Sequence, residues 1–227
     1  MGKLKRENNA RGEESFSFSA LQFNLLAEQH LKREYRDFVT FLIRELDIPD
    51  EARILHIGCR TGQLSLELAR RMPEINLLAV DEDAEMIRLA QENQRSSGVE
   101  NVQFQHLTFQ QFSNFESDLF DVVISFQLLH FVDDPVFLLN QIWRTVKKEG
   151  KFAIEDYRRD LQMLGKIGIW FAATTMNREI RQYWKQQFRT SYSLREVVNL
   201  LMRTNLKDWK IRTTLLDYLI YYDGKEE

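Results

Sequence analysis

Between residues 53 and 157 the sequence alternates short apolar runs with stretches in which apolar residues recur at helical spacing. The fourth run, FDVVISF, is apolar almost throughout, which is typical of a strand buried on both faces. Strands that alternate with helices of roughly 10–15 residues form parallel sheets covered by those helices. The alternation therefore predicts an α/β fold on a mostly parallel sheet, with strands at 53–57, 76–80, 102–106, 120–126 and 151–155.

The helix that follows the fourth strand has the clearest boundaries. Asp134 can cap its first turn and Pro135 suits the first helical position. Lys147 and Lys148 are expected in its last turn, because cations are favoured at a helix C-terminus. Gly150 is expected to end it.

The flanking segments predict other structures. The N-terminal residues mix charges without periodicity, so we expect a disordered tail. A helical pattern then continues, as one long helix or two shorter ones, until Pro49, which lacks a backbone donor. We divide the chain into a tail, an N-terminal helical segment, an α/β core, a helical lid and a helix with two strands that completes the core: 1–15, 16–50, 51–157, 158–192 and 193–227.

Composition excludes several classes of protein. Lys and Arg number 31 against 34 Asp and Glu, and a net charge of −3 gives no global attraction to nucleic acid. No stretch approaches the roughly 18 apolar residues of a membrane span. The one cysteine, Cys59, excludes a disulfide framework and a thiolate zinc cluster and fits a reducing compartment. We therefore expect a cytoplasmic chain without a metal site, whose oligomeric state does not follow from its sequence.

The first strand is followed by a loop with two glycines, Gly58 and Gly62. Glycines between a strand and a helix let the backbone turn sharply and approach a ligand closely. A dinucleotide fingerprint needs three glycines, of which only Gly58 is in place, and the phosphate-binding loop GxxxxGK[ST] is absent. Since open parallel sheets bind ligands at the carboxyl ends of their strands, we expect a site at this loop.

This loop and four further blocks resemble the class I S-adenosylmethionine (SAM)-dependent methyltransferases, especially the small-molecule type related to quinone biosynthesis. The resemblance covers roughly residues 35–222. It implies a Rossmann-like fold with a mostly parallel seven-stranded sheet, helices on both faces and a C-terminal antiparallel strand pair. It also implies SAM as cofactor and a small molecule as methyl acceptor. The blocks, in the family's order, are ILHIGCRTGQLSLELA, LLAVDEDAEMIRLA, FDVVISFQLLHFVDDP, KEGKFAIED and YSLREVVNLLMRTNLKDWKIR.

The resemblance implies cofactor contacts position by position. Gly58 and Gly62 would shape the turn beneath the methionine part of SAM. Asp81, at the end of the second strand, would accept hydrogen bonds from the ribose hydroxyls. Gln127 would border the methionine group and the acceptor. The other positions implied to border the cofactor are His56, Cys59, Glu82, Met86 and Thr108.

Three positions depart from the family's pattern. His56 and Thr108 stand where the family usually has acids, and Arg60 stands where it has glycine. A histidine could replace the first acid only in its neutral form. Arg60 either points to solvent or fills space that the cofactor needs. These departures leave an alternative open, a catalytically weakened methyltransferase-like protein that acts as a binding or interaction partner.

Catalytic residues are not fixed by a motif, because methyl transfer needs an aligned nucleophile more than a strong acid or base. Where the acceptor must lose a proton, a histidine or a carboxylate near the pocket helps. The candidates are His130, Asp156 and Tyr157. For His130, a histidine satisfied by the backbone at a helix start is an equally good interpretation.

Residues 158–189 carry seven basic and two acidic side chains, a net charge of +5 against −8 for the remainder. Aromatic residues interleave with these charges. The segment fits a lid that selects an aromatic or anionic acceptor, a less favoured nucleic-acid face, or a helix pair that packs its aromatics inward.

Overall fold

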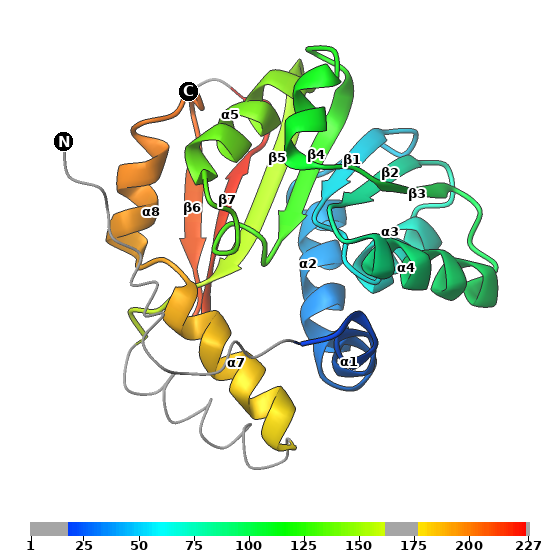
Figure 1. Cartoon of the computed structure of the whole chain (residues 1–227). Coiled ribbons are helices and arrows are strands. Elements are labelled where there is room, and N and C mark those ends of the chain that lie inside the picture. Colours follow the sequence, from blue (N-terminus) through cyan, green and yellow to red (C-terminus); the bar gives the residue numbers. More distant parts are fainter. Residues whose placement is uncertain (1–17, 162–176, 226–227) are drawn as a thin grey trace.

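The computed structural model describes residues 18–161 and 177–225, which form a seven-stranded sheet with helices on both faces (Figure 1). The strand order is β3-β2-β1-β4-β5-β7-β6. Strands β1 to β5 are parallel, and β7 runs antiparallel to both of its neighbours. The predicted mostly parallel sheet with a C-terminal antiparallel pair is confirmed. The strands, from β1 to β7, are Arg53–Ile57, Asn76–Asp81, Val102–His106, Phe120–Phe126, Val146–Tyr157, Lys210–Thr213 and Asp217–Tyr222.

Two apolar cores cover the two faces of the sheet. Successive residues of β1 alternate between them, with Ile54 in one core and Leu55 in the other. The first core packs under α1 (Ala20–Leu26), the π-helical η1 (Ala27–Leu31), α2 (Lys32–Arg44), α3 (Gln63–Arg71), α4 (Ala84–Ser97) and α7 (Arg178–Thr190). The second core packs under the 3-10 helix η2 (Phe109–Asn114), α5 (Pro135–Thr145) and α8 (Leu194–Leu201).

The end of α5 differs from the sequence prediction. Asp134 caps the helix as expected, accepting a hydrogen bond from the backbone of its third residue at 2.9 Å. The helix stops at Thr145, however, and Lys147, Lys148 and Gly150 belong to β5, so their predicted place at the helix end is wrong. The strand starts early because its first residue pairs with the beginning of β4, and tertiary pairing overrides the local helix signal.

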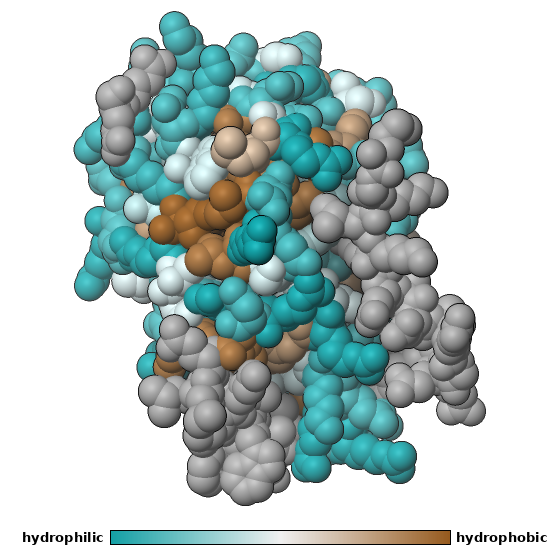
Figure 2. Space-filling model, turned by 90° about the vertical axis from the view of Figure 1, so that its left-hand side faces the viewer, coloured by the Kyte–Doolittle hydropathy of each residue, from teal (hydrophilic) through white to brown (hydrophobic). Residues whose placement is uncertain are grey.

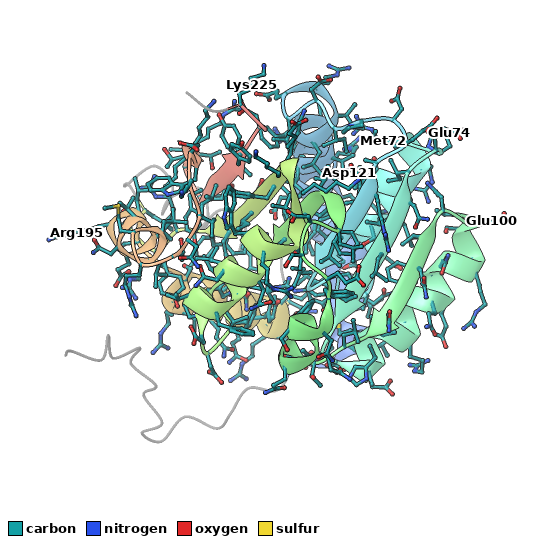
Figure 3. The ribbon with its side chains drawn as sticks, turned by 90° about the horizontal axis from the view of Figure 1, so that it is seen from above. Met72, Glu74, Glu100, Asp121, Arg195 and Lys225 are labelled. Atoms are coloured by element: carbon teal, nitrogen blue, oxygen red, sulfur yellow. The ribbon has the colours of Figure 1, made fainter. Side chains whose placement is uncertain are left out.

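The carboxyl ends of the parallel strands meet at one edge of the sheet. Ile57 pairs with Val80 on β2 and with Ser125 on β4, so the segments after these strands begin side by side. In Figure 1 this edge lies at the bottom, beside α1 and α7. The opposite edge, seen from above in Figure 3, carries the labelled residues Met72, Glu74, Glu100 and Asp121.

The face of the molecule on which α8 lies is largely hydrophilic (Figure 2). Figure 2 shows the side on which α8 lies, where an apolar area is surrounded by hydrophilic residues. Among the helices of residues 18–161 and 177–225, none is long and apolar enough to cross a membrane. The predicted tail, 1–15, and the middle of the predicted lid, 162–176, lie outside the described residues.

Candidate functional site

The loop after β1 makes the sharp turn that its glycines predict. Gly58 and Gly62 have φ values of +75° and +82°, a region that side chains disfavour. A Cβ on Gly58 would lie 2.8 Å from the side chain of Leu128, and one on Gly62 would lie 2.7 Å from Phe104. Both positions therefore favour glycine for conformation, and at Gly62 the Phe104 ring and the Ala90 side chain also leave no room for a Cβ.

Asp81 ties this loop to the end of β2. Its half-buried carboxylate accepts hydrogen bonds from the backbone N–H groups of Arg60 at 2.8 Å and Asp83 at 3.0 Å. Burial raises the pKa of Asp81, although these hydrogen bonds and the charge of Arg60 oppose that shift. The carboxylate is thus part of the loop's structure, not a freely solvated side chain.

A pocket of about 140 Å³ lies between this loop and the turn after β4. The volume is below the roughly 300–1,000 Å³ of typical ligand sites. Three residues that the resemblance implies for the cofactor, Gly58, Asp81 and Glu82, line the pocket. The other lining residues are apolar, namely Ile57, Phe112, Leu128, Phe131 and Val132.

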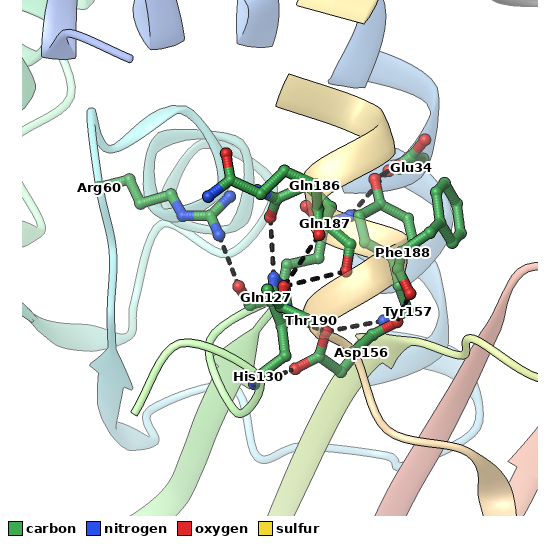
Figure 4. Close-up of polar contacts among 11 residues, drawn as sticks. Glu34, Arg60, Gln127, His130, Asp156, Tyr157, Gln186, Gln187, Phe188 and Thr190 are labelled. Atoms are coloured by element: carbon green, nitrogen blue, oxygen red, sulfur yellow. Dashed lines mark hydrogen bonds and ion pairs between the residues drawn. The ribbon is translucent and has the colours of Figure 1, made fainter. Parts of the chain in front are cut away.

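Arg60 turns across the carboxyl ends of β1 and β4 and does not extend into solvent. One guanidinium nitrogen donates a hydrogen bond of 2.5 Å to the main-chain carbonyl of Gln127, which Figure 4 shows. The guanidinium carbon lies 4.7 Å from the ring centre of Phe23 and 5.3 Å from that of Phe131. Arg60 therefore does not take the solvent-directed orientation, and its side chain fills the space in front of Gln127.

His56, Met86 and Thr108 do not line the pocket. The His56 imidazole is buried beside α3, with Nδ1 2.7 Å from the hydroxyl of Ser65. Burial, with a further contribution from the charge of Arg60, lowers the pKa of His56 to about 3, so the ring is neutral. Met86 packs against the core, and Thr108 forms a capping box with Gln111 at the start of η2.

Cys59 is also a core residue. Its side chain is buried, and burial, followed by the charge of Asp81, raises the pKa of the thiol well above its ordinary value. A buried thiol of this kind is a poor nucleophile, because the thiolate is the reactive form.

His130 and Asp156 form a fully enclosed cluster with Gln187 of α7 (Figure 4). His130 Nδ1 lies 2.5 Å from Asp156 Oδ1, and His130 Nε2 lies 2.8 Å from Gln187 Oε1. Asp156 also accepts the backbone N–H groups of His130 at 3.1 Å and Tyr157 at 2.7 Å. Since neither side chain of the pair is exposed, the cluster holds the turn after β4, the end of β5 and α7 together, and neither side chain can touch an acceptor in this arrangement.

A second ionisable group lies beside Gln127, on an element that the sequence did not connect with the site. Glu34 of α2 accepts hydrogen bonds from the side-chain amide of Gln127 at 3.0 Å and the hydroxyl of Tyr157 at 3.2 Å. Burial raises the pKa of this carboxyl to about 7, and the charges of Asp217 and Asp37 add to the effect. Of the three predicted catalytic candidates, Tyr157 alone contacts this group.

Glu34 carried little signal in the sequence. Its position within a charged helical stretch predicts a solvated side chain, and only the packing of α2 against the ends of β4 and β5 makes it part of the site. The described residues hold no cluster of His, Cys, Asp and Glu with the geometry of a metal site.

Known proteins of similar sequence are methyltransferases. An uncharacterized methyltransferase, YcgJ, of Bacillus subtilis is 28% identical over 116 residues, 51% of this chain and 45% of that protein. A ubiquinone biosynthesis O-methyltransferase of Aeromonas salmonicida is 32% identical over 108 residues, 48% of this chain and 44% of that protein. The chain thus spans about half the length of the curated relatives it matches.

Solved structures show the same fold at low sequence identity. A SAM-dependent methyltransferase from Aquifex aeolicus superposes with a TM-score of 0.70 at 16% identity, over 90% of this chain and 98% of that one. The plantazolicin methyltransferase BpumL, determined with S-adenosylhomocysteine (SAH), gives 0.66 at 18% identity, over 87% and 88%. The predicted Rossmann-like class I methyltransferase fold is therefore confirmed. Residues 48–217 match the model of the methyltransferase domain family, and with most of its length covered by that match, the chain belongs to this family.

Proposed function

We propose that the protein is a SAM-dependent methyltransferase that acts on a small-molecule acceptor. The observation that carries the proposal is the pocket at the ends of β1 and β2, bounded by the Gly58 loop and by the carboxylates of Asp81 and Glu82. In a Rossmann-like sheet, a carboxylate at this position accepts hydrogen bonds from ribose hydroxyls. The single, unpaired cysteine supports a reducing compartment such as the cytoplasm.

The residues fit the two halves of SAM unequally. The adenosyl half has a mostly apolar pocket with Asp81 and Glu82 in its lining. The methionyl half would lie toward Gln127, in the space that the Arg60 side chain fills. A long side chain can change rotamer without moving the backbone, so the residues fit SAM once Arg60 moves away.

When bound, SAM supplies an electrophilic methyl group on a sulfonium sulfur. The chain's part is to align the acceptor and to take its proton where it has one. Glu34 is suited to the second task, because its pKa of about 7 leaves a large deprotonated fraction at neutral pH. Gln127 and Tyr157 both donate hydrogen bonds to the same carboxylate oxygen of Glu34. None of the described residues donates to the other oxygen of this carboxylate. We therefore assign Glu34, with Tyr157, to proton transfer from a hydroxyl or carbon acid.

The basic character of residues 158–189 supports an acceptor that is aromatic or anionic, as the sequence predicts. The segment has a net charge of +5 and directly follows β5 in the sequence. The carboxyl end of β5 carries Tyr157.

Isothermal titration with SAM and SAH tests the proposal. We expect saturable binding of both ligands to the wild type, and a loss of about tenfold or more in Asp81→Asn, because a charged acceptor becomes a neutral one. Glu100→Gln, at the opposite edge of the sheet, is the matched control and should leave binding unchanged. Absence of heat from either ligand at millimolar concentration would reject the proposal in favour of a methyltransferase-like binding protein.

A further inference from the structure

The surroundings of the Arg60 guanidinium are those of a binding site for an organic cation. Phe23 of α1 and Phe131 of the turn after β4 each present a ring to the guanidinium, at 4.7 and 5.3 Å. The carbonyl of Gln127 accepts its hydrogen bond. Two aromatic faces and a carbonyl oxygen together attract a delocalised positive charge. We call these three groups, Phe23, Phe131 and the Gln127 carbonyl, the cation box.

Among residues 18–161 and 177–225, no acidic side chain forms an ion pair with the Arg60 guanidinium in the cation box. The Asp81 carboxylate accepts a hydrogen bond from the Arg60 backbone and acts on the guanidinium only through its charge. A buried ion pair is costly to break, because the remaining charge is left unpaired. Withdrawal of Arg60 would break no direct ion pair among the described residues, although the Asp81 carboxylate would lose the nearby charge that favours its ionised form. It would leave two ring faces and one carbonyl open to another cation.

The cation box adjoins the pocket. Phe131 belongs both to the box and to the pocket lining, so a ligand in the pocket lies next to the box. Phe131 is also 44% exposed, which leaves an open side through which the guanidinium can withdraw. Two cations cannot occupy one box, because like charges a few ångströms apart repel.

We propose that Arg60 is a tethered competitor that fills an organic-cation site and must leave it before a pocket ligand can place its own cationic centre there. The identity of the ligand rests on the proposed function. If the ligand is SAM, the cationic centre belongs to its methionyl part, which carries the sulfonium and ammonium groups. Arg60 then sets how strongly the protein distinguishes cationic SAM from SAH, whose sulfur is neutral.

Binding measurements on Arg60→Met test this competition. Methionine retains an apolar side chain of similar length but has no charge. We expect SAM to bind the variant about tenfold more tightly than the wild type, with a smaller gain for SAH. The neutral 5′-methylthioadenosine, which lacks the amino-acid part, should bind both proteins equally. Arg70→Met on α3 is the matched control, since its side chain lies on the exposed face of that helix and should alter none of the affinities.

A second measurement tests the cation box without the cofactor. Tetramethylammonium chloride should raise the unfolding temperature of Arg60→Met above that in equimolar sodium chloride, and it should have no such effect on the wild type, whose box is filled. Replacing Phe131 by Leu in the Arg60→Met background should abolish this stabilisation. If Arg60→Met does not fold, Arg60→Gln serves in both measurements.

The outcomes separate the inference from the proposed function. Equal SAM affinity in the wild type and Arg60→Met, with 5′-methylthioadenosine bound by both, would overturn the inference and leave the proposed function in place. Stabilisation of Arg60→Met by tetramethylammonium, with no adenosyl ligand bound by either protein, would support the cation box and overturn the proposed function.

Discussion

The imidazole of His130 and the carboxylate of Asp156 meet at 2.5 Å, and neither side chain is exposed to solvent. Replacing His130 by Ala leaves a buried carboxylate without its side-chain partner, which we expect to lower the free energy of unfolding by about 3 kcal/mol. His106→Ala is the control, because that imidazole is exposed and bonds only a backbone carbonyl, and it should cost less than about 1 kcal/mol. Urea unfolding measures both variants, and equal losses would contradict the structural role of His130.

Glu34 is expected to make stability depend on pH. Its pKa of about 7 lies above the ordinary value of 4.5, so the folded protein holds this proton more tightly than the unfolded chain does. The resulting stabilisation is complete below pH 4.5 and is lost as the pH rises toward about 7. For a half-buried group the change is on the order of 2 kcal/mol. Urea unfolding between pH 4.5 and 8 should show a flatter curve for Glu34→Gln than for the wild type.

The same variant tests proton transfer. With an acceptor that must lose a proton, the rate of methyl transfer by the wild type should rise with pH through about 7, as Glu34 deprotonates. Glu34→Gln should lose this limb of the profile and fall by about a hundredfold or more. Glu92→Gln, on the exposed face of α4, should keep the limb. A wild-type profile retained in Glu34→Gln would show that another group takes the proton.

Substitutions at Gly62 and Gly98 distinguish two ways in which a side chain at positive φ lowers stability, namely backbone strain and steric overlap. Gly98 has φ +67° and nothing within 4 Å of the place that a Cβ would take, so Gly98→Ala should cost about 1 kcal/mol, from backbone strain alone. Gly62 has φ +82° and would also place its Cβ 2.7 Å from the Phe104 ring. We expect Gly62→Ala to cost about 2 kcal/mol more than Gly98→Ala. Chemical denaturation measures both variants. Similar losses in the free energy of unfolding would mean that the Phe104 ring moves aside without strain.

Cys59 should be unreactive in the folded protein. Its thiol is buried and its pKa is raised well above the ordinary value by burial. A chromogenic thiol reagent at pH 8 should therefore label it only through opening of the structure, much more slowly than the unfolded chain in urea. Because the chain has a single cysteine, the absorbance reports this site alone. Labelling as fast as in urea would show that the β1 loop is open in solution.

Much of the fold follows from information local to the sequence. Apolar periodicity places strands at 53–57, 102–106 and 120–126, and the structure has them at those residues. Gly58 and Gly62 mark the turn because few other residues adopt its backbone angles. The exception is the end of α5, where cationic residues that suit a helix end are drawn into β5 by pairing with β4.

The candidate site follows from the sequence only in part. Asp81 and Glu82 line the pocket, because the end of a parallel strand fixes where the next residues lie. His130 and Asp156 were candidates by position, yet a glutamine of α7, on a segment distant in the chain, encloses them. Glu34 and Tyr157 are 123 residues apart, and nothing in either local sequence predicts their hydrogen bond.

By itself, then, the sequence determined where strands and helices follow one another along the chain, and where the glycine turn after β1 lies. Both depend on backbone preference and local apolar spacing. The tertiary structure decided the direction of Arg60. Its side chain is long enough to reach solvent or to cross the site, and Phe23 from α1 and Phe131 after β4 hold it across the site. Cation–aromatic attraction acts only between groups that folding has brought together, so it leaves no periodic trace in the chain.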